Sequence, residues 1–213
     1  MKRLSLWLSA LVLAVASLPA WAQALPIVGG TTSVKLTAAP LLTGAGISVS
    51  PLGSATASPG SDGLPLVYFP VTGGSLDTGS FAASIEHQGS GLLLSSATAS
   101  VNLTDFVIDT VGLRLTGDVA FGSTSLADVP LFNIGLTGSP FLPFSLALTS
   151  EAAGALSAIF GLPNLTGTVI GIANTLPITT AVPEPATVAS MLGGLGLMAW
   201  VLGQRRRGRA LQA

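Results

Sequence analysis

Residues 99–119 have the sequence ASVNLTDFVIDTVGLRLTGDV. Residues 99–108 form an apolar run of strand length rich in Val, Ile and Phe, and residues 114–119 form a second one. The residues between them include Asp and Gly, which favour turns. The order predicts two strands joined by a short turn. Alternation within residues 101–108 is only partial, so this strand is either buried on both faces or departs from simple register.

Runs of the same kind recur along the middle of the chain, separated by clusters of Gly, Pro, Ser, Asp and Asn. They cover residues 32–36, 46–49, 66–71, 80–86, 91–94 and 143–148. Short strands at regular spacing are typical of an antiparallel sandwich or a partly open barrel. One short helix is predicted over residues 150–160, capped by Ser150, opened by Glu151 and closed by Gly161. We therefore expect a mainly β domain over residues 25–172.

Composition excludes several classes of function. Only 8% of the 213 residues are charged. Residues 25–183 include two cationic and eight anionic side chains, a net charge of −6. This charge predicts no binding to nucleic acid or anionic lipid. The anions are Asp62, Asp77, Glu86, Asp105, Asp109, Asp118, Asp128 and Glu151. The absence of cysteine excludes disulfides, thiolate metal sites and cysteine nucleophiles.

The N-terminus has the three-part order of a secretory signal peptide. Lys2 and Arg3 precede the apolar run 4–18, and small residues follow at Ala20, Ala22 and Ala24. Signal peptidase is therefore expected to remove residues 1–24, with cleavage after Ala22 or Ala24. The alternative is an uncleaved membrane helix, but the apolar run is shorter than the roughly 20 residues that a span needs.

The C-terminal region begins with Val182, Pro183, Glu184 and Pro185, continues without a charge over residues 186–203 and ends in an arginine-rich segment, 204–213. The uncharged stretch is just long enough for a transmembrane helix. The arginines behind it, Arg205, Arg206, Arg207 and Arg209, are expected to stay cytoplasmic and to place the middle domain outside the inner membrane. Residues 173–185, rich in Pro and Thr, are interpreted as an extended linker.

This order of motif, apolar helix and arginine cluster resembles the PEP-CTERM tail, also catalogued as an ice-binding-protein C-terminal domain. The resemblance implies recognition by an exosortase, a membrane protease associated with exopolysaccharide and biofilm production in Gram-negative bacteria. It also implies anchoring in the inner membrane followed by release to the cell surface or medium. The alternative is a plain stop-transfer anchor, which leaves the Pro-Glu-Pro motif unexplained.

The middle domain carries a second resemblance. The segments FPVTGG at 69–74, IEHQG at 85–89, VNLTDFVID at 101–109 and LTGD at 115–118 are similar to haem-transport-associated domains of secreted bacterial proteins. Those domains are implied to be rich in β-structure, and some bind haem through a tyrosine aided by a histidine. The only tyrosine of this chain, Tyr68, cannot be matched to the ligand position, so the resemblance implies the fold and not the ligand.

Candidate catalytic and metal-binding residues are few. His87 is the only histidine, and no Gly-x-Ser-x-Gly motif accompanies it, so neither a catalytic triad nor a zinc site is predicted. Its polar neighbours Glu86 and Gln88 indicate a residue on the surface or in a hairpin. Asp105, Asp109, Asp118 and Asp128 lack the spacing of known calcium loops and are interpreted as turn and strand-edge residues.

Two classes of function stay open. The first is a non-catalytic surface or matrix protein, without cofactor, that is associated with exopolysaccharide. The alternative is an extracytoplasmic binding module for haem or another small apolar ligand. No catalytic constellation supports an enzyme.

Overall fold

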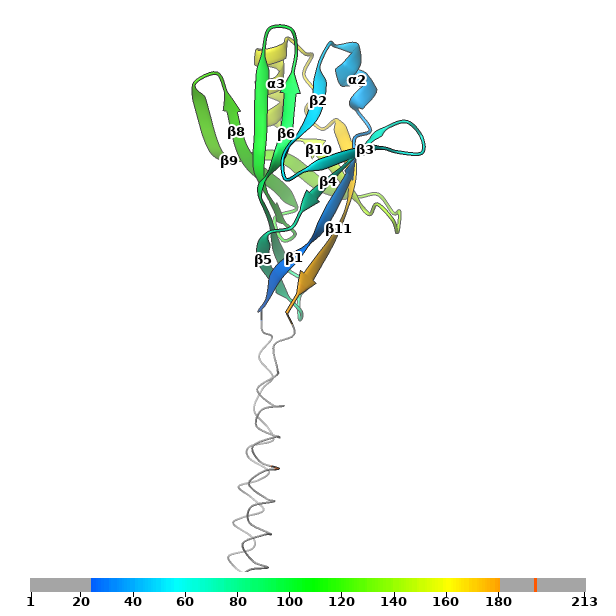
Figure 1. Cartoon of the computed structure of the whole chain (residues 1–213), viewed down its shortest axis with the longest axis vertical. Helices are drawn as coiled ribbons and strands as arrows, with labels where there is room; N and C mark the ends of the chain where they lie inside the picture. Colours follow the sequence, from blue (N-terminus) through cyan, green and yellow to red (C-terminus); the bar gives the residue numbers. More distant parts are fainter. Residues whose placement is uncertain (1–23, 181–193, 195–213) are drawn as a thin grey trace, which may run out of the picture. The chain divides into compact units, whose positions relative to one another are not determined.

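The structure, a computed structural model, describes residues 24–180 and Gly194. Residues Gln23–Thr180 form one compact unit. Its strands are β1 (Ala24–Lys35), β2 (Ser48–Gly53), β3 (Thr56–Pro59), β4 (Pro65–Pro70), β5 (Gly73–Asp77), β6 (Ala83–Ser95), β7 (Ser100–Asp109), β8 (Arg114–Phe121), β9 (Thr124–Leu136), β10 (Phe144–Leu148) and β11 (Val169–Thr179). Its helices are α2 (Ala39–Gly44) and α3 (Ser150–Phe160). The prediction of a mainly β domain is confirmed (Figure 1).

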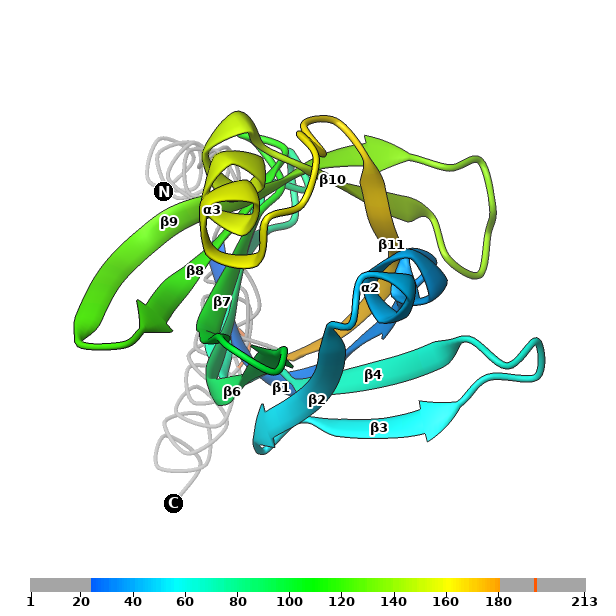
Figure 2. The ribbon, with the colours of Figure 1, turned by 90° about the horizontal axis from the view of Figure 1, so that it is seen from above.

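All strand pairings in this unit are antiparallel. Strands β5 to β11 lie side by side in the order of the chain. β1 pairs with β5 and with β11, so it lies between the two ends of this series. Residues 24–26 of β1 pair with β5, whereas its residues 31–35 pair with β4. Residues 90–95 of β6 pair with β2. The sheet therefore curls around an interior and splits between β4 and β2 (Figure 2). The sheet is antiparallel, as predicted, and it does not close completely, and we call this curled sheet the barrel.

Residues 99–119 form two paired strands, β7 and β8, as predicted. The incomplete alternation of apolar and polar residues in β7 has a local cause. Asp105 has a left-handed backbone, with φ 54°, at the bulge where the β7–β8 register shifts. Val101 and Leu103 face the interior before the bulge, and Phe106 and Ile108 face it afterwards. The bulge changes the inward positions from odd to even numbers, which simple alternation cannot anticipate.

The pairing of β6 with β7 has its own irregularity between His87 and Gly91. The sequence predicted separate strands at 80–86 and 91–94, whereas β6 runs continuously from Ala83 to Ser95. Gly89 adopts φ 70° in the interruption, and its amide donates to Asp105 Oδ1 at 2.7 Å. The two irregular residues therefore hold each other in place.

The predicted linker over residues 173–185 is wrong for its first part. Residues 173–179 belong to β11, which pairs with β1 from Lys35↔Ile172 to Ile27↔Thr179. Pro177 lies opposite Gly30, and a side chain at position 30 would collide with the backbone of β11. The domain therefore extends to Thr180 and not to residue 172. The proline content that suggested a linker is tolerated because this strand runs beyond its neighbour β10.

The predicted helix over residues 150–160 is confirmed, with the cap displaced by one residue. Thr149, not Ser150, is the N-cap, and its Oγ1 accepts from the amide of Ala152 at 3.1 Å. Gly161 ends the helix in a left-handed conformation, as expected. The six-residue helix α2 was not predicted, and Leu42 anchors it in the core.

The interior is divided between two hydrophobic clusters. The larger lies between the upper strands and α3, and the smaller consists of Ile27, Val71, Ala83 and Ile85 at the end where β1 begins. No helix within residues 24–180 is long and apolar enough to cross a membrane, and the predicted span at 186–203 lies outside the described residues.

Candidate functional site

The barrel interior contains an apolar cavity of about 340 Å³. Its walls come from α2 and α3, from β2 and from β6 to β11, and they consist almost entirely of Leu, Val, Ile, Ala and Phe side chains. Glu151 is the single charged residue among them. Leu126 and Glu151 line the cavity and are also exposed, so the cavity opens to solvent beside the first turn of α3.

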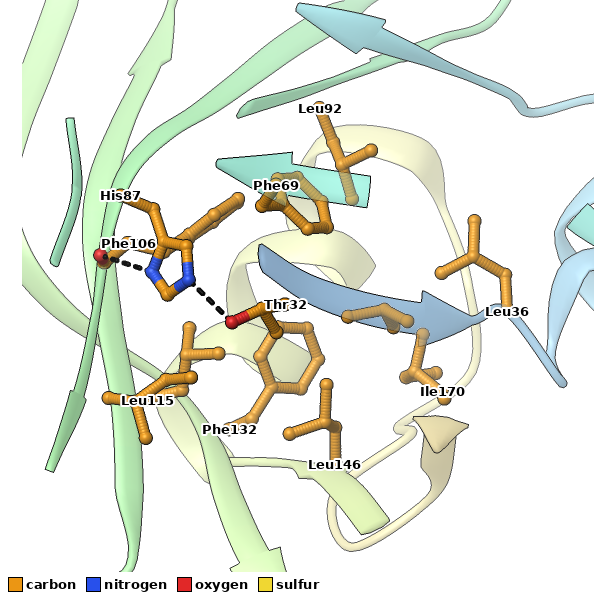
Figure 3. A pocket seen from close by; sticks show the side chains of 13 residues that line it. Thr32, Leu36, Phe69, His87, Leu92, Phe106, Leu115, Phe132, Leu146 and Ile170 are labelled. Atoms are coloured by element: carbon orange, nitrogen blue, oxygen red, sulfur yellow. Dashed lines mark hydrogen bonds between the residues drawn. The ribbon is translucent and has the colours of Figure 1, made fainter. Parts of the chain in front are cut away.

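A second cavity of about 60 Å³ continues the first toward the opposite end of the barrel. The two share Leu36, Leu92, Phe132 and Ile170 as wall residues. Among the described residues that line the two cavities, Thr32 and His87 are the only buried polar ones, and both belong to the smaller cavity (Figure 3).

His87 is 1% exposed, so its predicted position on the surface is wrong. It lies within β6 and points inward in phase with Ala83 and Ile85, while Glu86 and Gln88 face outward. The polar neighbours misled the prediction because they belong to the other face of the strand. The alternation of Ala83, Ile85 and His87 is the signal that would have placed it correctly.

Both ring nitrogens of His87 are hydrogen-bonded. Nδ1 lies 3.2 Å from the carbonyl oxygen of Phe106, and Nε2 lies 2.7 Å from Thr32 Oγ1. A carbonyl can only accept, so Nδ1 carries the proton and Nε2 accepts from Thr32. Thr32 Oγ1 also lies 3.0 Å from Thr175 Oγ1 and accepts from that hydroxyl. This series of hydrogen bonds joins β1, β6, β7 and β11. It leaves neither ring nitrogen of His87 free for a metal or a proton transfer.

The ring of His87 also contacts Phe69, whose ring meets it edge to face at 6.4 Å between centroids. Phe69 meets Phe106 in the same manner at 5.4 Å. Burial in this aromatic surrounding lowers the pKa of His87 below its ordinary value, and the hydrogen bond to Phe106 raises it only in part. His87 is therefore a neutral structural residue in the wall of the smaller cavity.

The buried histidine predicts a loss of stability in mild acid. Below the ordinary pKa of 6.5 the unfolded chain binds a proton that the folded chain does not, so the free energy of unfolding falls as pH falls. The slope reaches at most about 1.4 kcal/mol per pH unit. Thermal melts between pH 7.5 and 5 measure it, above the range in which the carboxylates titrate.

The matched control is His87→Gln, which retains hydrogen bonding without titrating. We expect its melting temperature to change little over this pH range. An equal acid sensitivity in both proteins would mean that another group is responsible.

Tyr68 does not line either cavity. It lies on β4 between Val67 and Phe69, both of which are buried, and therefore on the opposite face of the strand. The structure thus brings no tyrosine and histidine together in the interior.

The aspartates named from the sequence have separate structural roles. The amides of Gly112 and Val111 donate to Asp109 and lower the pKa of its carboxyl, and the ion pair with Arg114 lowers that pKa further. Asp105 supports the β6–β7 bulge, and Asp118 Oδ1 accepts from the amide of Asp128 at 3.0 Å. Within residues 24–180 no three His, Asp or Glu side chains meet as a metal site would require.

The other candidate residues concern processing. Ala24 is the first residue of β1, and Ala22 lies outside the described residues. The sorting motif Val182, Pro183, Glu184 and Pro185 and the anchor residues Arg205, Arg206, Arg207 and Arg209 also lie outside them.

Comparison with known proteins supports both resemblances. Residues 181–207 match the family model described as the PEP-CTERM protein-sorting motif, which implies an exported protein processed by exosortase. The domain is similar in structure to the C-terminal domain of HtaA from Corynebacterium glutamicum, with TM-score 0.50 and 13% identity over 73% of this chain and 99% of that one. It is also similar to the heme-binding protein HtaB of the same organism, with TM-score 0.48 and 8% identity over 75% and 99%.

No curated protein matches the sequence. The likeness to the HtaA domain establishes the fold of the middle domain and nothing about its ligand. The chain therefore combines a PEP-CTERM sorting tail with a middle domain whose fold is similar to that of the HtaA domain.

Proposed function

We propose that this protein is an exported, non-catalytic binding module that carries a small, uncharged, apolar molecule inside its barrel. The observation that supports it is the apolar cavity of about 340 Å³, a volume within the range of ligand pockets and well above that of ordinary packing voids. Filling it with a ligand restores contacts that the wall side chains otherwise lack.

The chemistry of the walls restricts the ligand. A charged group buried among aliphatic side chains would lose its hydration without a partner, so the buried part of the ligand is uncharged. Glu151 at the opening is ionised at neutral pH, because its own backbone amide and Ser150 Oγ donate to it and lower its pKa. Its carboxylate is an acceptor for a hydroxyl at the outer end of the ligand. A long-chain alcohol or a similar lipid-like molecule has this combination.

Haem fits the residues less well. Its iron needs an axial ligand, and both nitrogens of His87 are already bonded while Tyr68 lies on the other face of β4. The sequence predicted, as its alternative, a binding module for haem or another small apolar ligand. We propose the small apolar ligand and not haem.

Titration of residues 25–180 with two probes tests this proposal. The uncharged dye N-phenyl-1-naphthylamine is expected to bind one per domain with a rise in fluorescence and to be displaced by 1-dodecanol. Haemin is expected to give no saturable shift of its absorption band. A saturable haemin spectrum, or a dye signal that dodecanol does not displace, would contradict the proposal.

A second candidate is the matrix protein predicted from the sequence, whose domain contacts exopolysaccharide. The sorting motif supports it, because the resemblance associates that tail with exopolysaccharide production. In residues 24–180 both cations, Lys35 and Arg114, are engaged in ion pairs with Asp62 and Asp109. A polysaccharide partner would therefore be neutral. Co-sedimentation with the extracellular polymer tests it.

A further inference from the structure

Five large apolar side chains are exposed at one end of the barrel. Each is more than half exposed, although residues of this kind usually form the core. They are Val28 on β1, Phe81 in the β5–β6 turn, Val111 and Leu113 in the β7–β8 turn, and Ile178 on β11. We call this set the apolar rim.

The strand pairings bring these residues to the same end. The amide of Thr110 donates to the carbonyl of Ala83 at 3.0 Å, which places the β5–β6 and β7–β8 turns side by side. Ile27 pairs with Thr179, so β1 begins beside the end of β11 (Figure 1). The first residues of β1 also pair with the end of β5. The rim therefore surrounds the end of the domain from which the chain continues toward the C-terminus.

Two rim residues are held in an unfavourable backbone conformation. Phe81 has φ 59° and Leu113 has φ 49°, a region that Gly and Asn occupy readily and bulky residues rarely. A glycine would relieve each turn, yet a large apolar side chain is present and gains little burial within the domain. Strain of this kind at an exposed position points to a contact outside the domain.

The length of the following segment identifies the surface that the rim faces. β11 ends at Thr179, and the sequence predicts an apolar membrane helix from residue 186. The residues between span at most about 20 to 25 Å when fully extended. While the tail is anchored, the rim is held at the bilayer, where the local concentration of lipid is high.

Charges near the rim indicate the kind of lipid. Asp77 and Asp109 lie in its turns, and Arg114 is paired with Asp109. No lysine of the described domain lies there, since Lys35 is at the far end of β1. Nothing at the rim attracts anionic headgroups, so the contact is an apolar one with neutral lipid.

We propose that the apolar rim inserts into the interface of the bilayer in which the tail is anchored. The cavity opening then faces away from the membrane, because Leu126 pairs with Val119 at the opposite end of β8 from Leu113. This inference uses the predicted membrane helix and does not depend on the ligand proposed for the cavity.

The test uses tryptophan as a depth probe. All three tryptophans, Trp7, Trp21 and Trp200, lie outside residues 24–180. The mature chain from Leu25 with Trp200→Phe therefore offers a background without tryptophan, and Phe81→Trp adds one at the rim. After reconstitution in phosphatidylcholine vesicles with brominated acyl chains, its fluorescence is expected to be quenched strongly, since interfacial residues lie about 5–10 Å deep.

The matched control is Phe141→Trp, because Phe141 is as exposed as Phe81, at 81% against 77%, but lies in the β9–β10 loop that projects sideways (Figure 2). We expect about threefold stronger quenching at position 81 than at position 141, given that interfacial depth. Adding Val111→Ser and Leu113→Ser to Phe81→Trp should bring its quenching toward the control. Equal quenching at both positions, or no effect of the serine substitutions, would overturn the proposal.

Discussion

Replacing Ala152 with Phe is expected to abolish ligand binding by the barrel. Ala152 is buried in the first turn of α3 and lines the large cavity, so a phenyl ring at this position occupies the space of the ligand. We expect the affinity for N-phenyl-1-naphthylamine to fall by about 100-fold or more, which corresponds to about 2.7 kcal/mol. The same titration that tests the unaltered domain measures it.

Stability distinguishes a filled cavity from a damaged fold. Inserting a large side chain into a packed core costs about 1–3 kcal/mol, whereas a cavity of this size accepts it with little loss. The melting temperature of Ala152→Phe should therefore stay close to that of the unaltered domain. The control is Ala158→Phe, an exposed position on the same helix that does not line the cavity, and it should bind normally. Normal binding by Ala152→Phe would show that the dye binds elsewhere.

Replacing Pro183, Glu184 and Pro185 with alanine is expected to block maturation completely while the protein remains in the membrane. Two prolines favour an extended backbone, so we expect this segment to be accessible to a protease at the outer edge of the membrane. The experiment requires a host with the matching exosortase, and cell fractions are blotted for the barrel domain.

Replacing Arg205, Arg206 and Arg207 supplies the comparison. Each arginine costs about 2.5–3.5 kcal/mol to place in the centre of the bilayer, so we expect the cluster to keep the end of the predicted helix in the cytoplasm. Loss of the cluster should impair retention as well as processing. If the alanine variant of the motif matures to normal size in the normal fraction, the tail is only an anchor and the sorting prediction fails.

The sequence was sufficient to predict the strands that lie next to clear turns. Apolar runs at 66–71, 114–119 and 143–148 correspond closely to β4, β8 and β10, because each is short and regular. β9 was missed because Pro130 and polar residues interrupt it, and β11 because Pro177 resembles linker composition. In both strands, pairing with neighbours outweighs local propensity.

The candidate site was much harder to predict. A cavity forms where side chains from seven or more segments together leave part of the interior unfilled. No local sequence pattern indicates this unfilled volume. His87 illustrates the difficulty, because its burial depends on Thr32 and Phe106, which are distant in the sequence. By contrast, the sorting motif is a continuous stretch, and its prediction from residues 182–185 agrees with the family match.

The most direct measurement of the central claim locates the ligand within the domain. Methyl resonances of Leu, Val and Ile in residues 25–180 can be followed by NMR during titration with 1-dodecanol. If the ligand lies in the cavity, we expect saturable shifts for Leu94, Leu103 and Leu156 on its wall and none for the exposed Leu136. Shifts confined to exposed methyl groups, or no saturable shift at all, would contradict the account.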